Sequence, residues 1–360
     1  MRTIILLLSV FIYLQSVGQN IKQRIVLFGD AGEINAGQQL SIKKASEIII
    51  PDKSTVYFLG DNIYPYGMAL DSINFQESVE ILQSQILPFA KQNVPVTFLS
   101  GNHDWDKSGK NGLEKIKAQE RYIKSLNSSN IQFLPEAGTA NIITKTISSN
   151  LEIILFDSEY WLFPNHSNPD SALSTEIRRS FLNKIAAELA HNKDKHVLIL
   201  SHHPMRSYGE HGKNITWKDH IFPLTRKWKN LYIPLPVLGS IYPLLRTTVF
   251  NSAEDARHPI YKKFIADITA ITNSYKNVIF IAGHDHGLQF IQENDFTQII
   301  TGAGSKSSFI AHNSSQKFVS NQQGFCVLDC MDNGNLLVSF YTVTADTSNK
   351  SFEFLIPSIK

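Results

Sequence analysis

The chain has 360 residues, of which 42% are hydrophobic, so it is long enough for one large or two ordinary domains with a substantial core. Lys and Arg number 34 against 32 for Asp and Glu. This balance gives neither the basic field typical of nucleic-acid binding nor an acidic, solvating tail. Composition therefore argues against a disordered chain and gives no indication of a nucleic-acid partner.

The first 18 residues have the pattern of a secretory signal peptide. Arg2 precedes the apolar stretch Ile4 to Leu14, which is shorter than the ordinary membrane span of about 20 residues. Ser16 and Gly18 fit a small-x-small cleavage site. We therefore predict export after removal of residues 1–18, to the periplasm, the cell surface or the medium, with an uncleaved anchor as the alternative.

Hydrophobic strands then alternate with amphipathic helices. The pattern predicts strands over Arg24–Phe28, Thr55–Leu59 and Val96–Leu99, and helices over Ala36–Ile50, Ser72–Ala90 and Asn111–Leu126. Strands at Asn141–Thr146 and Leu151–Phe156, a helix at Thr175–Ala190 and strands at His196–Leu200 and Asn277–Ala282 follow. The remainder is rich in strands and includes a hairpin turn at Asp332-Asn333-Gly334. This order predicts an α/β sandwich of two packed sheets covered by helices.

One catalytic domain is predicted over residues 23–345, followed by a C-terminal extension over 346–360. Within the domain, 212–259 is rich in aromatic residues and prolines, which make it too apolar for a linker and too broken for one helix. We interpret it as an insertion that forms either a lid over the site or a satellite core away from it. A membrane contact through Leu235 to Leu245 is a further hypothesis, although no basic amphipathic face supports it.

The two cysteines, Cys326 and Cys330, lie in a segment predicted to be extended. Four residues along a strand correspond to about 13 Å, which is beyond the reach of a disulfide. A single Cys-x3-Cys also lacks the partners of a zinc site. We therefore predict two reduced thiols.

Five polar clusters stand where hydrophobic runs end. They are Gly29-Asp30-Ala31-Gly32, Gly60-Asp61-Asn62-Ile63-Tyr64, Gly101-Asn102-His103-Asp104, Ser201-His202-His203-Pro204 and Gly283-His284-Asp285-His286. Open α/β sheets bind ligands outside the carboxyl ends of their strands. Carboxylate, amide and phenolate oxygens suit hard cations, and imidazole extends the range to iron, zinc and manganese. Because two metals can clamp both oxygens of a displacement at phosphorus, the clusters predict a two-metal phosphoester hydrolase.

The order of these motifs and the residues in them resemble the motifs of the calcineurin-like metallophosphoesterases and, more narrowly, of the purple acid phosphatases of the tartrate-resistant type. Most of the superfamily has Asp-x-His in the first motif, whereas Gly32 stands at that position here. Purple acid phosphatases have a tyrosine three residues after the second aspartate, as Tyr64 follows Asp61 here. The resemblance covers approximately Arg24 to Thr344 and implies a four-layer αββα sandwich of two mixed sheets flanked by helices.

The resemblance also implies the cofactors and their ligands, with two metal ions in the site. Fe(III) would be bound by Asp30, Asp61, Tyr64 and His286. A divalent ion, which is iron, zinc or manganese in relatives, would be bound by Asp61, Asn102, His202 and His284. Asp61 would then bridge the two ions, and a phenolate on ferric iron would colour the protein violet.

His103 is similar to the family residue that binds no metal and protonates the departing alkoxide. Asp104 beside it either orients the imidazole or caps a turn. Glu210 and His211 follow the His-His-Pro motif as a Glu-His pair does in the mammalian tartrate-resistant type. The resemblance therefore implies that these two residues contact substrate.

His203 replaces an aromatic residue of the family pattern, so either His202 or His203 is the metal ligand. Residues adjacent on a strand face opposite ways, and only one of them easily reaches the metal. We choose His202 because it aligns with the family's ligand.

The favoured function is an exported, acid phosphatase-like enzyme that cleaves small-molecule phosphate monoesters. A metal-bound hydroxide would attack directly while His103 protonates the leaving group. A phosphodiesterase or nucleotide pyrophosphatase with the same metals is the alternative. A catalytically inactive, metal-containing surface binding protein is the rival from another class, and His103 argues against it because a structural site needs no uncoordinated acid. Oligomeric state is left open between a monomer and an unknown oligomer.

Overall fold

The computed structural model describes residues 20–167, 174–212, 221–222, 224, 231–235 and 253–359. The predicted signal peptide, most of the predicted insertion and most of the segment from Leu235 to Leu245 lie outside the described residues. Within the described ranges, no helix combines the length and the apolar content needed to cross a membrane.

The first sheet has the strand order β14-β13-β12-β1-β2-β3-β4. Strands β1 to β4 run parallel, whereas β12, β13 and β14 are antiparallel to their neighbours, so the sheet is mixed. The bounds are β1 (Ile21–Phe28), β2 (Ser54–Leu59), β3 (Val96–Leu99), β4 (Ile131–Phe133), β12 (Gly324–Met331), β13 (Leu336–Thr344) and β14 (Thr347–Ile356).

The second sheet has the strand order β11-β9-β10-β8-β7-β6-β5. Strands β6, β7, β8 and β10 run parallel, and β5, β9 and β11 are antiparallel to their neighbours. The bounds are β5 (Ile142–Ser148), β6 (Leu151–Phe156), β7 (His196–Leu200), β8 (Val278–Ala282), β9 (Leu288–Glu293), β10 (Phe296–Thr301) and β11 (Gln316–Ser320).

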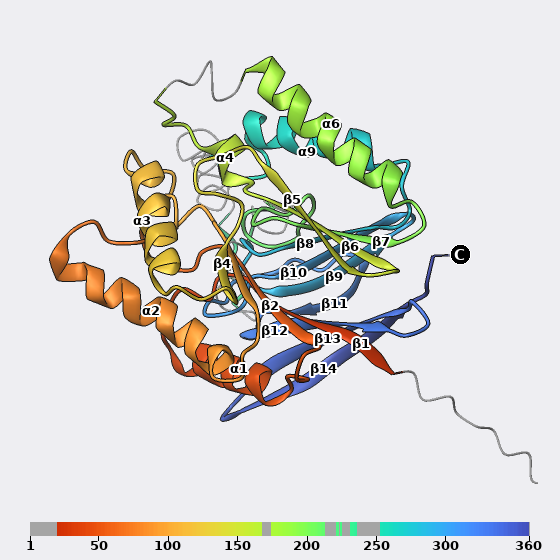
Figure 1. Ribbon diagram of the computed structural model, residues 1–360, viewed down its shortest axis with the longest axis horizontal. Coiled ribbons are helices and arrows are strands. Elements are labelled where there is room, and N and C mark those ends of the chain that lie inside the picture. Colours follow the sequence, from red (N-terminus) through yellow and green to blue (C-terminus); the bar gives the residue numbers. More distant parts are fainter. Residues whose placement is uncertain are drawn as a thin grey trace, which may run out of the picture.

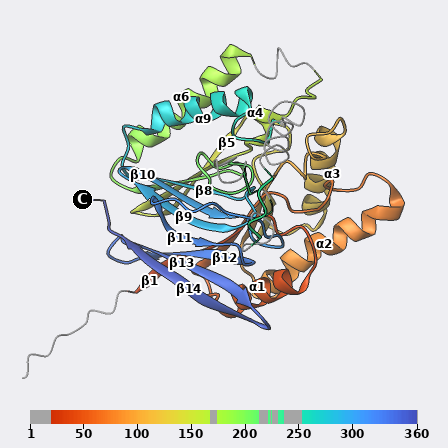
Figure 2. The same ribbon diagram turned by 180° about the vertical axis from the view of Figure 1, so that it is seen from behind.

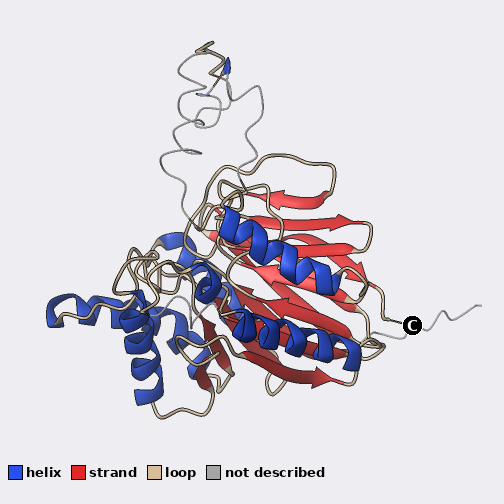
Figure 3. Ribbon diagram, turned by 90° about the horizontal axis from the view of Figure 1, so that it is seen from above, coloured by secondary structure: helices blue, strands red, loops and turns tan. Residues whose placement is uncertain are grey.

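Helices cover the outer faces of the two stacked sheets (Figure 1, and from behind in Figure 2). On the first sheet lie α1 (Ala36–Glu47) and α2 (Ser72–Ala90), with α3 (Gly112–Ser125) against β4. On the second sheet lie α4 (Glu159–Leu162), α6 (Thr175–His191) and α9 (Pro259–Thr272). Seen from above in Figure 3, long helices lie over a sheet and run roughly along its strands. The predicted α/β sandwich of two mixed sheets flanked by helices is confirmed.

The central strands are apolar on both faces because each face packs against a different layer. In β1, Ile25 and Leu27 belong to the core between the two sheets, whereas Val26 and Phe28 belong to the core beneath the helices. Successive side chains of a strand point to opposite faces, so burial on both sides requires a continuous apolar run.

Several predicted boundaries differ from the structure by a few residues, and two of the differences have a physical reason or a structural consequence. The first helix ends at Glu47 rather than Ile50, because a residue before a proline, here Pro51, disfavours the helical region. The predicted C-terminal extension contains β14, which pairs with β13 from Leu336 to Thr344 and therefore completes the edge of the first sheet. Both cysteines are free, as predicted, and both are buried.

Candidate metal centre

Glycines allow the strand ends of the two sheets to approach closely. A Cβ atom on Gly29, after β1, would lie 2.7 Å from the Cα atom of Gly283, after β8. A Cβ atom on Gly101, after β3, would lie 2.4 Å from the Oδ1 atom of Asp61. Any larger residue at these two positions would push apart the turns that carry the polar clusters.

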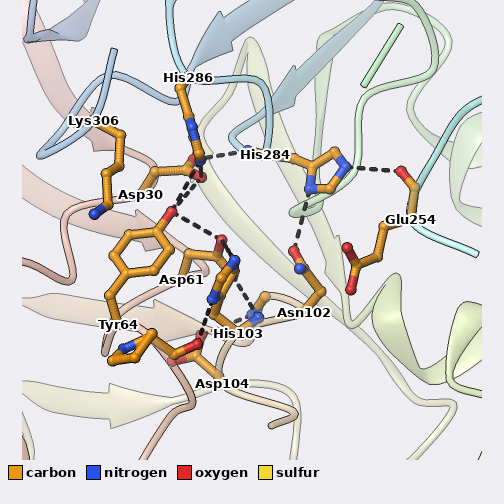
Figure 4. A network of polar contacts seen from close by, with 12 residues as sticks. Asp30, Asp61, Tyr64, Asn102, His103, Asp104, Glu254, His284, His286 and Lys306 are labelled. Carbon is orange, nitrogen blue, oxygen red and sulfur yellow. Dashed lines mark hydrogen bonds and ion pairs between the residues drawn. The ribbon is translucent and has the colours of Figure 1, made fainter. Parts of the chain in front are cut away.

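Three residues of the clusters have the left-handed backbone conformation. Their φ angles are 58° for Asp30, 55° for Asp61 and 68° for His284. This region is sparsely populated by residues other than glycine and costs on the order of 1 kcal/mol or more each. Each residue directly follows a glycine at a strand exit, so the conformation turns its side chain out of the sheet toward the shared space (Figure 4).

One group of side chains forms around the phenol of Tyr64. The Tyr64 Oη atom lies 3.0 Å from Asp30 Oδ1, 3.0 Å from Asp61 Oδ2 and 3.2 Å from His286 Nε2. His286 Nε2 lies 3.4 Å from Asp30 Oδ1. The carboxylates and the imidazole are close enough together to hold one metal ion.

A second group forms around the amide of Asn102. Its Oδ1 atom lies 3.0 Å from His202 Nε2 and 3.2 Å from His284 Nδ1. His202 Nε2 also lies 3.4 Å from Asp61 Oδ1. One oxygen of Asp61 therefore faces the first group and the other faces the second, which is the position of a bridging ligand.

The charge of the site fits cations. Asp30 and Asp61 are 0% and 1% exposed, and buried carboxylates this close together are unfavourable without positive charge. Burial opposes the ionised form of Asp61, but the imidazoles of His202 and His103 lower its pKa to about 2. Burial and the two carboxylates raise the pKa of the Tyr64 phenol well above its ordinary value, so a phenolate requires a cation beside it.

Main-chain carbonyls fix the two histidines of the second group. His202 Nδ1 lies 2.7 Å from the Leu59 carbonyl oxygen, and His284 Nε2 lies 2.9 Å from that of Glu254. A carbonyl only accepts, so these nitrogens carry the ring protons and donate. The opposite nitrogens, which face Asn102, are then the lone-pair donors that a metal requires.

His103 lies beside the two groups without joining either. Its Nε2 atom is 3.9 Å from Asp61 Oδ2, and its ring contacts that of Tyr64 edge-on at 4.5 Å. Its Nδ1 atom donates to the Pro65 carbonyl oxygen at 2.6 Å. The imidazole is thereby held with Nε2 toward Asp61, and Figure 4 shows the ring between Asp61 and the carbonyl oxygen that it contacts.

Asp104 caps the turn and does not orient His103. Its carboxylate accepts hydrogen bonds from the Asn62 main-chain N–H at 3.0 Å and the Gly101 N–H at 2.8 Å. Because the Pro65 carbonyl holds the His103 ring, the contacts of Asp104 fit the turn cap, which was one of its two predicted roles, and not the catalytic role of orienting the imidazole. Through these hydrogen bonds Asp104 connects the second polar cluster, which contains Asn62, to the third, which contains Gly101.

The ring nitrogens of His203 lie near partners other than Asn102. Its Nδ1 atom lies 2.9 Å from the hydroxyl of Ser158, and its Nε2 atom lies 3.7 Å from a carboxylate oxygen of Glu159. Its ring nevertheless approaches those of His202 and His284, so the three imidazoles are close enough to hold one ion. We prefer His202 as the ligand because it alone of the two neighbours also faces the shared carboxylate, Asp61.

His211 lies against the second group, with its ring centroid 4.1 Å from that of His284. Its main-chain N–H donates to Asp285 Oδ1 at 2.8 Å, and its Nδ1 atom lies 3.6 Å from Asp255 Oδ1. Burial opposes the charged form, but the carboxylates of Asp255 and Asp285 raise the pKa of His211 to about 9. Glu210 is half-buried in the turn before it, and the substrate contacts predicted for both residues stay predictions.

Comparison with known families agrees with this geometry. Residues 23–230 match the model of the calcineurin-like phosphoesterases. The chain belongs to this family. The family identifies the chain as a metal-dependent phosphoester hydrolase. Together with the two groups of candidate ligands, it implies a dinuclear metal centre.

Among curated proteins, this phosphoesterase is similar to tartrate-resistant acid phosphatase type 5. The rat protein is 24% identical over 296 residues, which cover 78% of this chain and 72% of the relative. The mouse protein is 26% identical over 255 residues, covering 68% and 59%. These relatives support the narrower resemblance to purple acid phosphatases.

Two solved structures share the fold of this phosphoesterase. The purple acid phosphatase PPD1 of yellow lupin is 17% identical, with a TM-score of 0.57 over 93% of this chain and 53% of that chain. GAP50, the anchor in the inner membrane complex of Plasmodium, is 18% identical, with a TM-score of 0.55 over 95% of this chain and 90% of that chain. At these identities the likeness concerns the fold.

Three charged residues beside this phosphoesterase centre were not predicted from the sequence. Glu254 and Asp255 contact His284 and His211, respectively, from the end of the predicted insertion. Lys306 lies against the ring of Tyr64. No motif marks the first two, but Lys306 directly follows Thr301-Gly302-Ala303-Gly304-Ser305, so the glycines after β10 were a usable signal.

Proposed function

We propose that the protein is an exported dinuclear phosphohydrolase that cleaves phosphate monoesters, in the manner of an acid phosphatase. The observation that carries this proposal is the position of Asp61 between two donor groups, with the imidazole of His103 uncoordinated beside them. A metal site that served structure alone would have no use for such an imidazole.

When bound, two ions polarise the phosphoryl group and lower the pKa of water, so that hydroxide is available at ordinary pH. Asp30, Tyr64 and His286 would hold one ion, and Asn102, His202 and His284 would hold the other. Asp61 would contact both and fix their separation.

His103 would supply the proton that the leaving alkoxide needs. With Nδ1–H donated to Pro65, a second proton on Nε2 makes an imidazolium, and Asp61 at 3.9 Å stabilises that charge. Transfer of the Nε2 proton to the leaving oxygen returns the ring to neutral without moving it. The fixed orientation of the ring therefore suits a general acid.

We propose Fe(III) in the Tyr64 group and divalent iron, zinc or manganese in the Asn102 group. The support is the phenol, because a phenolate among two carboxylates and an imidazole matches a hard trivalent ion. Metal analysis should find two ions per chain, and a visible spectrum should show a violet band that disappears in Tyr64→Phe. Two colourless divalent ions would overturn the ferric assignment.

The catalytic proposal is tested by turnover of p-nitrophenyl phosphate. His103→Ala should lower turnover by roughly 10²- to 10⁴-fold while both ions stay bound. His312→Ala, which removes an exposed imidazole, serves as the matched control. Unchanged turnover of the His103 variant would reject its role. Faster cleavage of bis(p-nitrophenyl) phosphate than of the monoester would favour the phosphodiesterase alternative.

Export is part of the proposal and rests on the pattern of residues 1–18. Expression of the full chain in a bacterial host should yield, in the periplasmic or extracellular fraction, a protein that begins at or near Gln19. Retention of Met1 in a cytoplasmic fraction would reject export without affecting the phosphatase proposal.

A further inference from the structure

The loop after β10 is fixed to both turns that carry ligands of the Tyr64 group. Gly304 N–H donates to the Gly29 carbonyl oxygen at 3.0 Å, and Ser305 N–H donates to that of Asp30 at 2.8 Å. On the other side of Lys306, Ser308 N–H donates to the His286 carbonyl oxygen at 2.8 Å. The Cα atom of Lys306 is therefore held in a constant position relative to the metal ligands.

The side chain of Lys306 reaches the same group. Its Nζ atom lies 4.6 Å from the centroid of the Tyr64 ring, and Figure 4 shows it on the side of Asp30, Tyr64 and His286. Among the described residues, Lys306 is the one lysine or arginine in contact with a predicted metal ligand. A positive charge is thus available at the open half of the centre.

The present partner of Lys306 is easily replaced. Its ammonium pairs with Glu33, whose side chain is 48% exposed. Such surface pairs add little to stability because solvent screens them, and the four-carbon stem of lysine is flexible. A phosphoryl group carrying two charges is a stronger partner than an exposed carboxylate.

We infer that Lys306 is a substrate-binding residue that moves from Glu33 to an oxygen of the substrate's phosphate, and that it selects doubly charged monoesters over singly charged diesters. This inference rests on the proposed phosphatase function and adds its substrate preference. The Glu33 carboxylate holds the ammonium beside the site before substrate arrives.

Binding of inorganic phosphate to the metal-loaded protein tests the inference independently of turnover. By isothermal titration, Lys306→Met should weaken phosphate binding about tenfold, and Lys306→Arg should recover most of it because the charge is kept. Lys317→Met removes an exposed lysine of β11 and should bind phosphate as the wild type does. Equal metal contents would establish that the centre itself is intact.

Kinetics give a second readout. Lys306→Met should raise KM for p-nitrophenyl phosphate about tenfold with kcat within a factor of about two, and should lower the preference over bis(p-nitrophenyl) phosphate by a similar factor. Unchanged phosphate affinity in Lys306→Met, or no phosphate binding by the wild type, would overturn the inference. Phosphate binding that depends on Lys306 in a protein without turnover would support it while rejecting the phosphatase proposal.

Discussion

The two halves of the metal centre differ in how their histidines are held. In the Asn102 half, His202 and His284 are 0% and 2% exposed, and each donates its outer N–H to a main-chain carbonyl. In the Tyr64 half, the side chain of His286 is 24% exposed, and the ammonium of Lys306 lies over the ring of Tyr64.

The difference suggests that one half of the centre is built to hold a metal ion and the other to receive the substrate's phosphate. Rings that are buried and hydrogen-bonded keep their orientation before an ion binds, so the Asn102 half resembles a preorganised ligand set. The Tyr64 half is open to solvent and has a cation beside it, so we expect the substrate's phosphate to approach from there. Asp61 belongs to both halves and is the residue through which they are coupled.

The largest effect should come from breaking that coupling. Asp61→Asn replaces the shared carboxylate by a neutral amide of the same shape, so both halves lose their common negative ligand. We expect fewer than two ions per chain and a loss of p-nitrophenyl phosphate turnover of roughly 10³-fold or more. Elemental analysis and turnover on the same sample measure both.

Asp295→Asn is the matched control, because this carboxylate is exposed and pairs with Lys276 far from the centre. The control should keep two ions and full turnover. If Asp61→Asn also kept both, the two halves would be independent sites, and the bridging role of Asp61 would be rejected.

A smaller effect should be confined to the Asn102 half. His202→Ala removes a ligand from this half alone, so we expect loss of one ion, retention of the other and about 100-fold lower turnover. His203→Ala should keep both ions, because its nitrogens face Ser158 and Glu159 rather than Asn102. Loss of the ion in His203→Ala but not in His202→Ala would reverse the assignment.

The sequence was sufficient to predict which side chains meet, because the information is local. A buried apolar run that ends in Gly-Asp, Gly-Asn or Gly-His both predicts a strand and marks its carboxyl end, where neighbouring parallel strands bring such residues together. The clusters that these patterns mark do meet in the structure, whereas the choice of particular residues within them came from the family resemblance. Those residues are Asp30, Asp61, Tyr64, Asn102, His202, His284 and His286.

The supporting contacts could not be predicted in the same way. The groups that hold His103, His202 and His284 are the carbonyl oxygens of Pro65, Leu59 and Glu254, and every residue type supplies an identical carbonyl. These carbonyl groups act through their position in the fold, so the identity of the residue that carries each one gives no sign of its role. Strand β14 was missed for a related reason, since an edge strand with exposed residues lacks the continuous apolar run of the central strands.

The smallest expected effect concerns the contact between Asp255 and His211, whose ring packs against His284 of the Asn102 half. Burial opposes the charged form of His211, but Asp255, together with Asp285 and Glu254, raises its pKa to about 9, above an unfolded value of about 6.5. A raised folded pKa contributes stability that is fully present below pH 6.5 and is lost as the pH rises through about 9. In metal-depleted protein, Asp255→Asn should therefore lower the free energy of unfolding by on the order of 1 kcal/mol near pH 6.5, and the difference from wild type should shrink toward pH 9.

Urea unfolding at several pH values between 6 and 9.5 measures this difference directly, with Asp295→Asn again as the control that should show none. A difference that stayed constant across that range would mean that Asp255 acts through packing or a neutral hydrogen bond, and the charged state of His211 would be rejected. A difference that vanished with rising pH would show that the imidazolium beside His284 is held by Asp255. The segment that ends the predicted insertion would then contribute to the Asn102 half twice, through this charge and through the Glu254 carbonyl.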